Sequence, residues 1–158
     1  MAREHTVDVH VTHKFNHAKL EFIMHSPLGA VAKDLLKRGH RVEARAKRNL
    51  SGIGGSGPRR VDTGLLRSSI SVQLMVHPQG LAVRVGTNVL YSRYVHDGTG
   101  LYGPKRQLIR PKFAKVMVFR SKIAGAKKGK YKGLVFAKTT KGMKPNPFLK
   151  DALPAFKD

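Results

Sequence analysis

Two short segments near the middle of the chain carry an apolar residue at every second position. The first has Ile70, Val72, Leu74 and Val76, and the second has Leu81, Val83 and Val85. Such strict alternation is typical of a strand with one buried face. The residues between the segments, 77–80, read His-Pro-Gln-Gly and favour a turn, because proline fixes φ and glycine accepts a positive φ. The pattern predicts a β-hairpin, and a hairpin needs a second element to cover its apolar face.

The segment before the hairpin has the periodicity of an amphipathic helix. Its apolar residues recur at spacings of three, four and seven, at Leu28, Val31, Leu35, Val42, Ala46 and Leu50. Ser26-Pro27 is a typical helix start, with serine as N-cap and proline at the first helical position. We expect one helix of about six turns ending near Leu50, in which Gly39 marks close packing or a slight bend. The predicted core of helix and hairpin comprises Leu35, Val42, Ile70, Val72, Leu74 and Val83.

The rest of the N-terminal half gives weaker signals. Residues 7–11 alternate valine with polar residues and predict a short edge strand. Residues 14–25 are ambiguous, since their apolar residues could continue a strand or begin a helix, and we interpret them as a loop leading into a strand. Residues 51–57 are rich in glycine and serine and predict a flexible connection. Thr63 is placed to cap a short helical turn through Leu65 and Leu66.

The C-terminal half begins with residues 90–96, which we interpret as a short helix or a wound turn. Tyr91, Tyr94 and Val95 lie on one side of it, where we expect the tyrosines to pack against the hairpin. Strand signals at 114–119 and 133–137 predict a second hairpin with a long basic tip at about 120–132.

A short terminal helix closes the predicted fold. Asn146 is placed to cap it and Pro147 to occupy its first position. Its core-facing residues are predicted to be Phe148, Leu149, Ala152 and Leu153. The expected fold class is α+β, in which a small antiparallel sheet packs on one long amphipathic helix. Since 158 residues suffice for one modest core, we expect a single domain over residues 1–158.

The charge of the chain limits the kinds of partner it can have. Thirty-one lysines and arginines stand against nine acidic residues, which gives a net charge of +22. Such an excess favours an acidic partner, whether nucleic acid, an acidic protein surface or a membrane headgroup layer. Membrane association is the least expected, because no apolar run is long enough to span a bilayer and no surface helix has a clean apolar face. The N-terminus lacks an apolar signal core, which predicts synthesis in the cytoplasm.

No residue pattern predicts catalysis, a cofactor or a metal. The chain has no cysteine, and strand spacing would place His10 and His13 on opposite faces. Ser68-Ser69 lacks a nearby base with a third orienting group. The glycine-rich segment 52–57 follows no apolar strand and precedes no Gly-Lys-Ser/Thr, so it does not match a phosphate-binding loop. We therefore expect a protein that is not an enzyme.

Several motifs in order resemble a known family. After the basic helix come Thr63-Gly-Leu-Leu-Arg-Ser-Ser-Ile70, Tyr91-Ser-Arg-Tyr-Val-His-Asp-Gly-Thr99, Ile109-Arg-Pro111 and Asn146-Pro-Phe-Leu149 with Ala152. This series resembles the small neck proteins of long-tailed double-stranded-DNA phages, called tail-completion or head–tail joining proteins, over about residues 26–153. Such proteins usually carry a glutamate two residues before the Gly-Thr pair, where this chain has His96 followed by Asp97.

The resemblance implies a structural protein of the virion, made in the host cytoplasm. Its copies would form a homo-oligomeric ring between the head connector and the tail tube, around the path of the DNA. Neighbouring head-connector and tail proteins would be its partners. Rings of this kind require heterologous interfaces that close.

Two stretches are predicted to contact partners. We expect the turn formed by Asp97, Gly98, Thr99 and Gly100 to lie at a subunit boundary, because its glycines allow close backbone approach. Between Asp97 and Asp151 the chain has fifteen cations and no acid. In its predicted tip, the basic contact residues are Lys127, Lys128, Lys130 and Lys132.

Two partners compete for those lysines. DNA would release condensed counterions on binding, whereas an acidic face of a neighbouring neck protein would offer charge complementarity. We favour the protein partner, with weak sequence-independent DNA contact as a secondary role, because a tight grip would oppose DNA sliding. The alternative function is a general nucleic-acid-binding protein, which predicts cations grouped with exposed aromatic residues.

Overall fold

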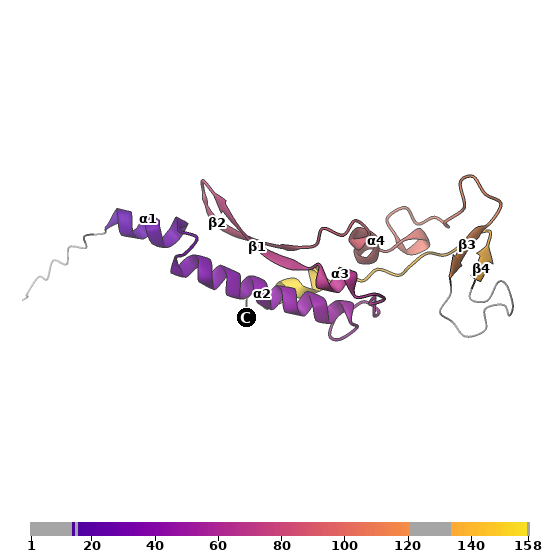
Figure 1. The fold of residues 1–158 in the computed structure, drawn as a ribbon, viewed down its shortest axis with the longest axis horizontal. Coiled ribbons are helices and arrows are strands. Elements are labelled where there is room, and N and C mark those ends of the chain that lie inside the picture. Colours follow the sequence, from indigo (N-terminus) through magenta and orange to yellow (C-terminus); the bar gives the residue numbers. More distant parts are fainter. Residues whose placement is uncertain (1–13, 15, 121–133, 158) are drawn as a thin grey trace, which may run out of the picture.

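A long helix and a hairpin laid along it form the body of the molecule (Figure 1). The computed structural model describes residues 14, 16–120 and 134–157. Helix α2, Ala30–Leu50, packs against strands β1, Ser71–His77, and β2, Gly80–Gly86. The α+β fold class and the end of the long helix at Leu50 are confirmed. The predicted strand at residues 7–11 lies outside the described residues.

The hairpin has the predicted antiparallel pairing but a tighter turn. Its strands pair from Ser71 with Gly86 to His77 with Gly80, so only Pro78 and Gln79 form the loop. Figure 1 shows the hairpin rising away from α2 toward this tip. Val76 near the tip is accordingly 59% exposed, although its place in the alternation predicts burial.

Gly39 is the point of closest contact between α2 and the hairpin. It is buried, and a Cβ atom added to it would lie 2.7 Å from Val83 Cγ1 and 2.8 Å from Val72 Cγ1. Of the two expectations for Gly39, close packing is therefore confirmed. The absence of a side chain lets two β-branched residues, which have little rotamer freedom, press against the helix backbone.

The segment before α2 is helical, so its interpretation as a loop and strand is wrong. Helix α1 spans His17–His25, and the Asn16 side chain accepts a hydrogen bond from the Lys19 amide at 3.1 Å. This contact caps the helix and outweighs the weak strand pattern. No residue of α1 is buried. Its apolar side chains are exposed at Leu20, Phe22, Ile23 and Met24.

Ser26-Pro27 separates the two helices and does not begin the second one. The Ser26 hydroxyl accepts a hydrogen bond from the Leu28 amide at 3.3 Å, and the Ser26 carbonyl accepts one from the Gly29 amide at 3.0 Å. These bonds form a turn, and Pro27 has no amide hydrogen with which α1 could continue. Helix α2 begins after Gly29, and Leu28 is 81% exposed.

Short elements complete the chain. They are α3 (Leu65–Ser68), α4 (Ser92–Asp97), the 3-10 helix η1 (Gly100–Tyr102), β3 (Met117–Arg120), β4 (Leu134–Ala137) and the 3-10 helix η3 (Lys150–Phe156). The Thr63 hydroxyl accepts a hydrogen bond from the Leu65 amide at 3.4 Å, at the predicted start of α3. Strands β3 and β4 pair antiparallel as the predicted second hairpin, in a sheet separate from β1–β2.

The hydrophobic core is centred on the C-terminal segment. Phe148 is fully buried, and it forms a cluster with Leu50, Ile70 and Ala152, around which further residues pack. Val42 and Ile70 are buried as predicted, whereas Leu35, Val72, Leu74 and Val83 are only partly buried. The predicted core is therefore displaced toward the end of α2, where the chain returns between this helix and α4. Leu153, predicted to face the core, is 62% exposed.

The stability lost when a core side chain is truncated should increase with the burial of that side chain. Phe148→Ala removes a fully buried ring and should lower the free energy of unfolding by about 3–5 kcal/mol. Leu74→Ala should cost less than the 2–5 kcal/mol typical of a fully buried leucine, because Leu74 is partly exposed. Chemical denaturation measures both, and an equal loss for the two variants would contradict this placement of the core.

Gly39→Ala should destabilise the protein, although alanine is the better helix former by about 1 kcal/mol. The new methyl group would overlap Val72 and Val83, and overpacking of this kind costs about 1–3 kcal/mol. Lys37→Ala, at an exposed position of the same helix, is the matched control and should leave the denaturation midpoint nearly unchanged. A stabilised Gly39→Ala variant would show that the helix and hairpin are not in contact there.

Candidate interaction surfaces

The turn at residues 97–100 packs against a later segment of the same chain. The Thr99 amide donates to the Met143 carbonyl at 2.9 Å, and the Met143 amide donates to the Thr99 hydroxyl at 2.9 Å. Gly98 is buried with φ at 79°, and a Cβ atom there would lie 2.9 Å from the Met143 carbonyl oxygen. The close backbone approach that the glycines predict is thus made within the subunit. The glycines therefore do not support a subunit boundary at Asp97–Gly100, and that boundary stays a prediction.

The Asp97 carboxylate at this turn is also held by its own helix. His96 Nδ1 lies 2.8 Å from Asp97 Oδ1, and Arg93 Nε lies 3.8 Å from Asp97 Oδ2. The His96 ring meets the Phe148 ring edge to face, with centroids 5.5 Å apart. His96, which stands where the resembling family has glutamate, therefore connects the turn to the core.

Two buried asparagines tie the C-terminal segment to the end of α2. Asn49 Nδ2 donates to the Phe148 carbonyl at 3.1 Å, and Asn146 Nδ2 donates to the Pro58 carbonyl at 2.7 Å. Both residues are fully buried. Asn146 does not cap the terminal helix as predicted, because its Oδ1 atom accepts no hydrogen bond among the described residues and Leu149 holds the N-cap position of η3. Sequence patterns gave no signal for the role of Asn49.

The glycine-rich segment 51–57 is packed in place, so its interpretation as a flexible connection is wrong. A Cβ atom at Gly57 would lie 2.5 Å from the Asn146 Cα atom, which leaves room only for glycine. Asp151 Oδ2 accepts hydrogen bonds from the Ser56 amide at 2.9 Å and the Ser56 hydroxyl at 2.5 Å. The hydroxyl bond, followed by the amide bond, lowers the pKa of Asp151.

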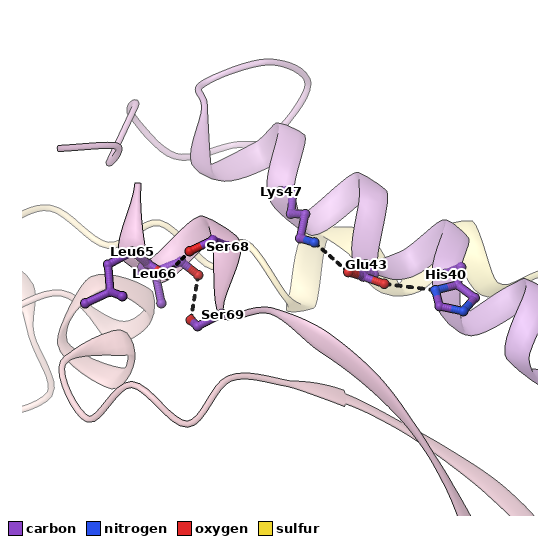
Figure 2. A network of polar contacts seen from close by, with 7 residues as sticks. All are labelled: His40, Glu43, Lys47, Leu65, Leu66, Ser68 and Ser69. Atoms are coloured by element: carbon purple, nitrogen blue, oxygen red, sulfur yellow. Dashed lines mark hydrogen bonds and ion pairs between the residues drawn. The ribbon is translucent and has the colours of Figure 1, made fainter. Parts of the chain in front are cut away.

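Several polar side chains on α2 and at α3 also make contacts within their own helix (Figure 2). The Ser68 hydroxyl donates to the Leu65 carbonyl at 3.0 Å, and the Ser69 hydroxyl donates to the Leu66 carbonyl at 2.9 Å. On α2, Lys47 and His40 both contact Glu43, and the hydrogen bond from Lys47 is the main cause of the lowered pKa of Glu43. These contacts lie within one helix or at its end, and they bring no nucleophile to a base.

Metal-binding side chains do not gather in the part of the chain that the structure describes. It contains no group of three or more histidine, cysteine or acidic residues. His10 and His13 lie outside that part. No helix among residues 14, 16–120 and 134–157 is long and apolar enough to cross a membrane.

An extended arm leaves the body after η1. The arm is defined as residues 103–120 and 134–142, and Figure 1 shows it running out to the β3–β4 pair. The two segments of the arm are joined at Ile109 and Thr140, where the amide of each residue donates to the carbonyl of the other at 3.0 Å. Seven of its cations have exposed side chains: Lys105, Arg106, Arg110, Lys112, Lys115, Lys138 and Lys141. The chain has no acidic residue between Asp97 and Asp151, so no acid of the arm offsets them.

Large apolar side chains are exposed along the same arm. Phe113 is 99% exposed, Val118 53% and Phe119 43%. Near the base of the arm, Tyr91 and Tyr94 are 41% and 60% exposed, so the expectation that they pack against the hairpin is wrong. Lys127, Lys128, Lys130 and Lys132 lie outside the described residues, and their contacts stay a prediction.

Comparisons with known proteins add no relative. No family model matches the chain, and neither a curated protein nor a solved structure is significantly similar to it.

The contact between Asp151 and Ser56 predicts a pH dependence of stability. Since the folded-state pKa of Asp151 is lowered, its contribution is complete above the ordinary carboxyl pKa of 3.8 and is lost as the pH falls through the lowered value. Asp151→Asn should lower the thermal midpoint at neutral pH, and its difference from the unmodified protein should shrink below about pH 4.

Asp34→Asn is the control for this measurement. Asp34 forms an exposed ion pair with Arg38 on the same helix, at 2.8 Å, and such pairs contribute little. A difference between Asp151→Asn and the unmodified protein that is constant down to pH 2.5–3, roughly one unit below the ordinary carboxyl pKa, would contradict the assignment.

Proposed function

We propose that this chain is a structural protein of the phage neck, whose copies form a ring joining the head connector to the tail tube around the DNA path. The observation that carries the proposal is the meeting of three motifs far apart in the sequence. Ile70 from the first motif, Val95 from the second and Phe148 from the third belong to one core cluster. Each of these three motifs thus contributes at least one buried residue to the core of the subunit, as expected if the motifs specify a common fold.

The exposed apolar surface also supports an assembled state. The fully buried apolar residues of the described chain are few, and several of them are alanines, while twenty large apolar side chains are exposed. Helix α1 has nine residues and buries none of them. Isolated helices of this length are marginal in water. A subunit of this kind gains stability when neighbours cover these surfaces, which fits a ring in the virion.

For the basic tip at about 120–132 we propose an acidic face of a neighbouring neck or tail protein as the main partner. Weak contact with DNA is a secondary role. An ejection path must let DNA slide, and many simultaneous phosphate contacts would give a strong, salt-dependent grip.

A general nucleic-acid-binding function is the second candidate, and one observation favours it. The arm combines exposed cations with exposed aromatic residues, such as Phe113 and Phe119. This is the arrangement expected of proteins that bind single strands by stacking and charge.

Replacement of four lysines separates the two candidates. Lys127, Lys128, Lys130 and Lys132 are changed to glutamine together, and heads, tails and joined particles are counted by electron microscopy. The neck proposal predicts unjoined heads and tails, because the acidic neighbour loses its contact. It also predicts that the salt dependence of duplex-DNA binding hardly changes.

A second variant controls for the loss of charge. Lys33 and Lys37 on α2 and Lys150 and Lys157 at the two ends of η3 are exposed, and they lie outside both α1 and the arm. Their change to glutamine removes the same charge. This variant should join heads to tails normally. Normal joining by the first variant, with a salt slope reduced by several units, would contradict the proposal and favour nucleic-acid binding.

A further inference from the structure

The β3–β4 pair at the end of the arm is a two-stranded sheet with apolar side chains on both faces. Val118 pairs with Phe136 on one face, and Phe119 pairs with Val135 on the other. Val118 is 53% exposed and Phe119 is 43% exposed, so each face presents apolar surface to solvent. Neither strand pairs with another strand among the described residues, so each keeps one free edge.

Such a pair of strands is poorly stabilised on its own. Isolated two-stranded sheets are marginal in water, and stable ones pack a face against another layer. Figure 1 shows β3 and β4 far from α2, the element that covers the first hairpin. The surface that completes β3–β4 is therefore one that the described body of this subunit does not provide.

The surroundings of β3–β4 define the charge of that surface. Lys115 precedes β3, Lys138 follows β4, and both side chains are exposed. The stretch has no acid to neutralise them. A complementary surface thus has an apolar centre with carboxylates around it, since charge complementarity at the rim sets orientation and partner choice.

We infer that β3–β4 docks on a different protein, one that presents an apolar patch rimmed by acidic residues. Rim complementarity argues against a second copy of this chain, because each copy carries a net charge of +22. Four of the six acidic residues in the described chain are also engaged within the subunit: Asp34 by Arg38, Glu43 by Lys47, Asp97 by His96 and Asp151 by Ser56. The ring contacts proposed above therefore use other surfaces, such as α1.

The apolar character of the pair also argues against nucleic acid as its occupant. Stacking on bases uses aromatic rings, and each face offers one phenylalanine, Phe136 or Phe119, beside the aliphatic side chain of Val118 or Val135. Phosphates and bases would satisfy the lysines and the rings but leave the aliphatic part of each face in water. A protein surface satisfies both requirements at once.

Two synthetic acidic peptides of equal length and charge test this inference in the full-length protein. One alternates glutamate with valine, and the other alternates glutamate with serine. Oligothymidylate of the same charge is the third probe, and binding is followed by fluorescence anisotropy at physiological ionic strength. We expect the glutamate–valine peptide to bind about tenfold more tightly than either of the others.

Two variants locate the binding on β3–β4. Val118→Thr keeps the β-branched shape and strand preference but replaces a methyl group by a hydroxyl. It should weaken the binding of the glutamate–valine peptide several-fold and leave the binding of the glutamate–serine peptide unchanged. Lys115→Gln with Lys138→Gln should weaken both acidic peptides. Lys33→Gln with Lys37→Gln, on the exposed face of α2, is the matched control and should weaken neither beyond the general effect of net charge.

Each contrary result has a definite meaning. Equal binding of the two peptides would show that the site recognises charge alone. Tighter binding of oligothymidylate would show that the site binds nucleic acid. Loss of self-association in Val118→Thr would show that the site binds a second copy of this chain. Any of these overturns the inference. It rests on the proposed function only for the source of the partner. Unjoined heads and tails in the four-lysine variant, together with no peptide preference, refute the inference alone. Peptide preference together with normal joining in that variant refutes the neck role alone.

Discussion

The return of the chain at residues 143–152 is the contact on which the rest of the fold depends. Phe148 packs with core residues of α2 and α4, the Asn49 side chain donates to the Phe148 carbonyl, and the Asn146 side chain donates to the Pro58 carbonyl. A buried amide without these partners would cost about 1–3 kcal/mol, so they fix the position of the returning segment as well as stabilising it. The glycine-rich segment and the turn at 97–100 pack against the same stretch, which brings both ends of the arm together at its base.

This arrangement divides the subunit into a closed part and an open part. Around Phe148, small residues such as Gly57, Ala46 and Ala152 allow close packing. In the arm and in α1, large apolar side chains and unopposed cations face solvent. The closed part explains how a chain with few large buried residues holds a defined fold, and the open part explains why we look for its function in contacts with other molecules.

The local patterns of the sequence predicted most of the helices and strands. They did not predict the contacts between distant segments. Alternation predicted β1–β2, periodicity predicted α2 to its last residue, and Gly39 indicated close packing. Helix α1 was missed because its apolar residues do not form a helical stripe, and the local signal for it is the Asn16 cap. The Asn49–Phe148 contact joins residues 99 positions apart, and no periodic pattern encodes it. Tyr91 and Tyr94 were predicted to pack against the hairpin, but both side chains are exposed, and Val95 of the same helix is the one that joins the core around the returning segment.

The mass of the native assembly tests the central claim, that the open surfaces of the subunit are covered by neighbours in a closed ring. Native mass spectrometry of the purified full-length chain, over a range of concentrations, measures it directly. Our account predicts one dominant species at a fixed multiple of the 17.5 kDa subunit mass. A closed ring does not grow beyond that number as concentration rises, because its heterologous contacts are all satisfied. A monomer at every concentration, or an open-ended series of multiples, would contradict the account.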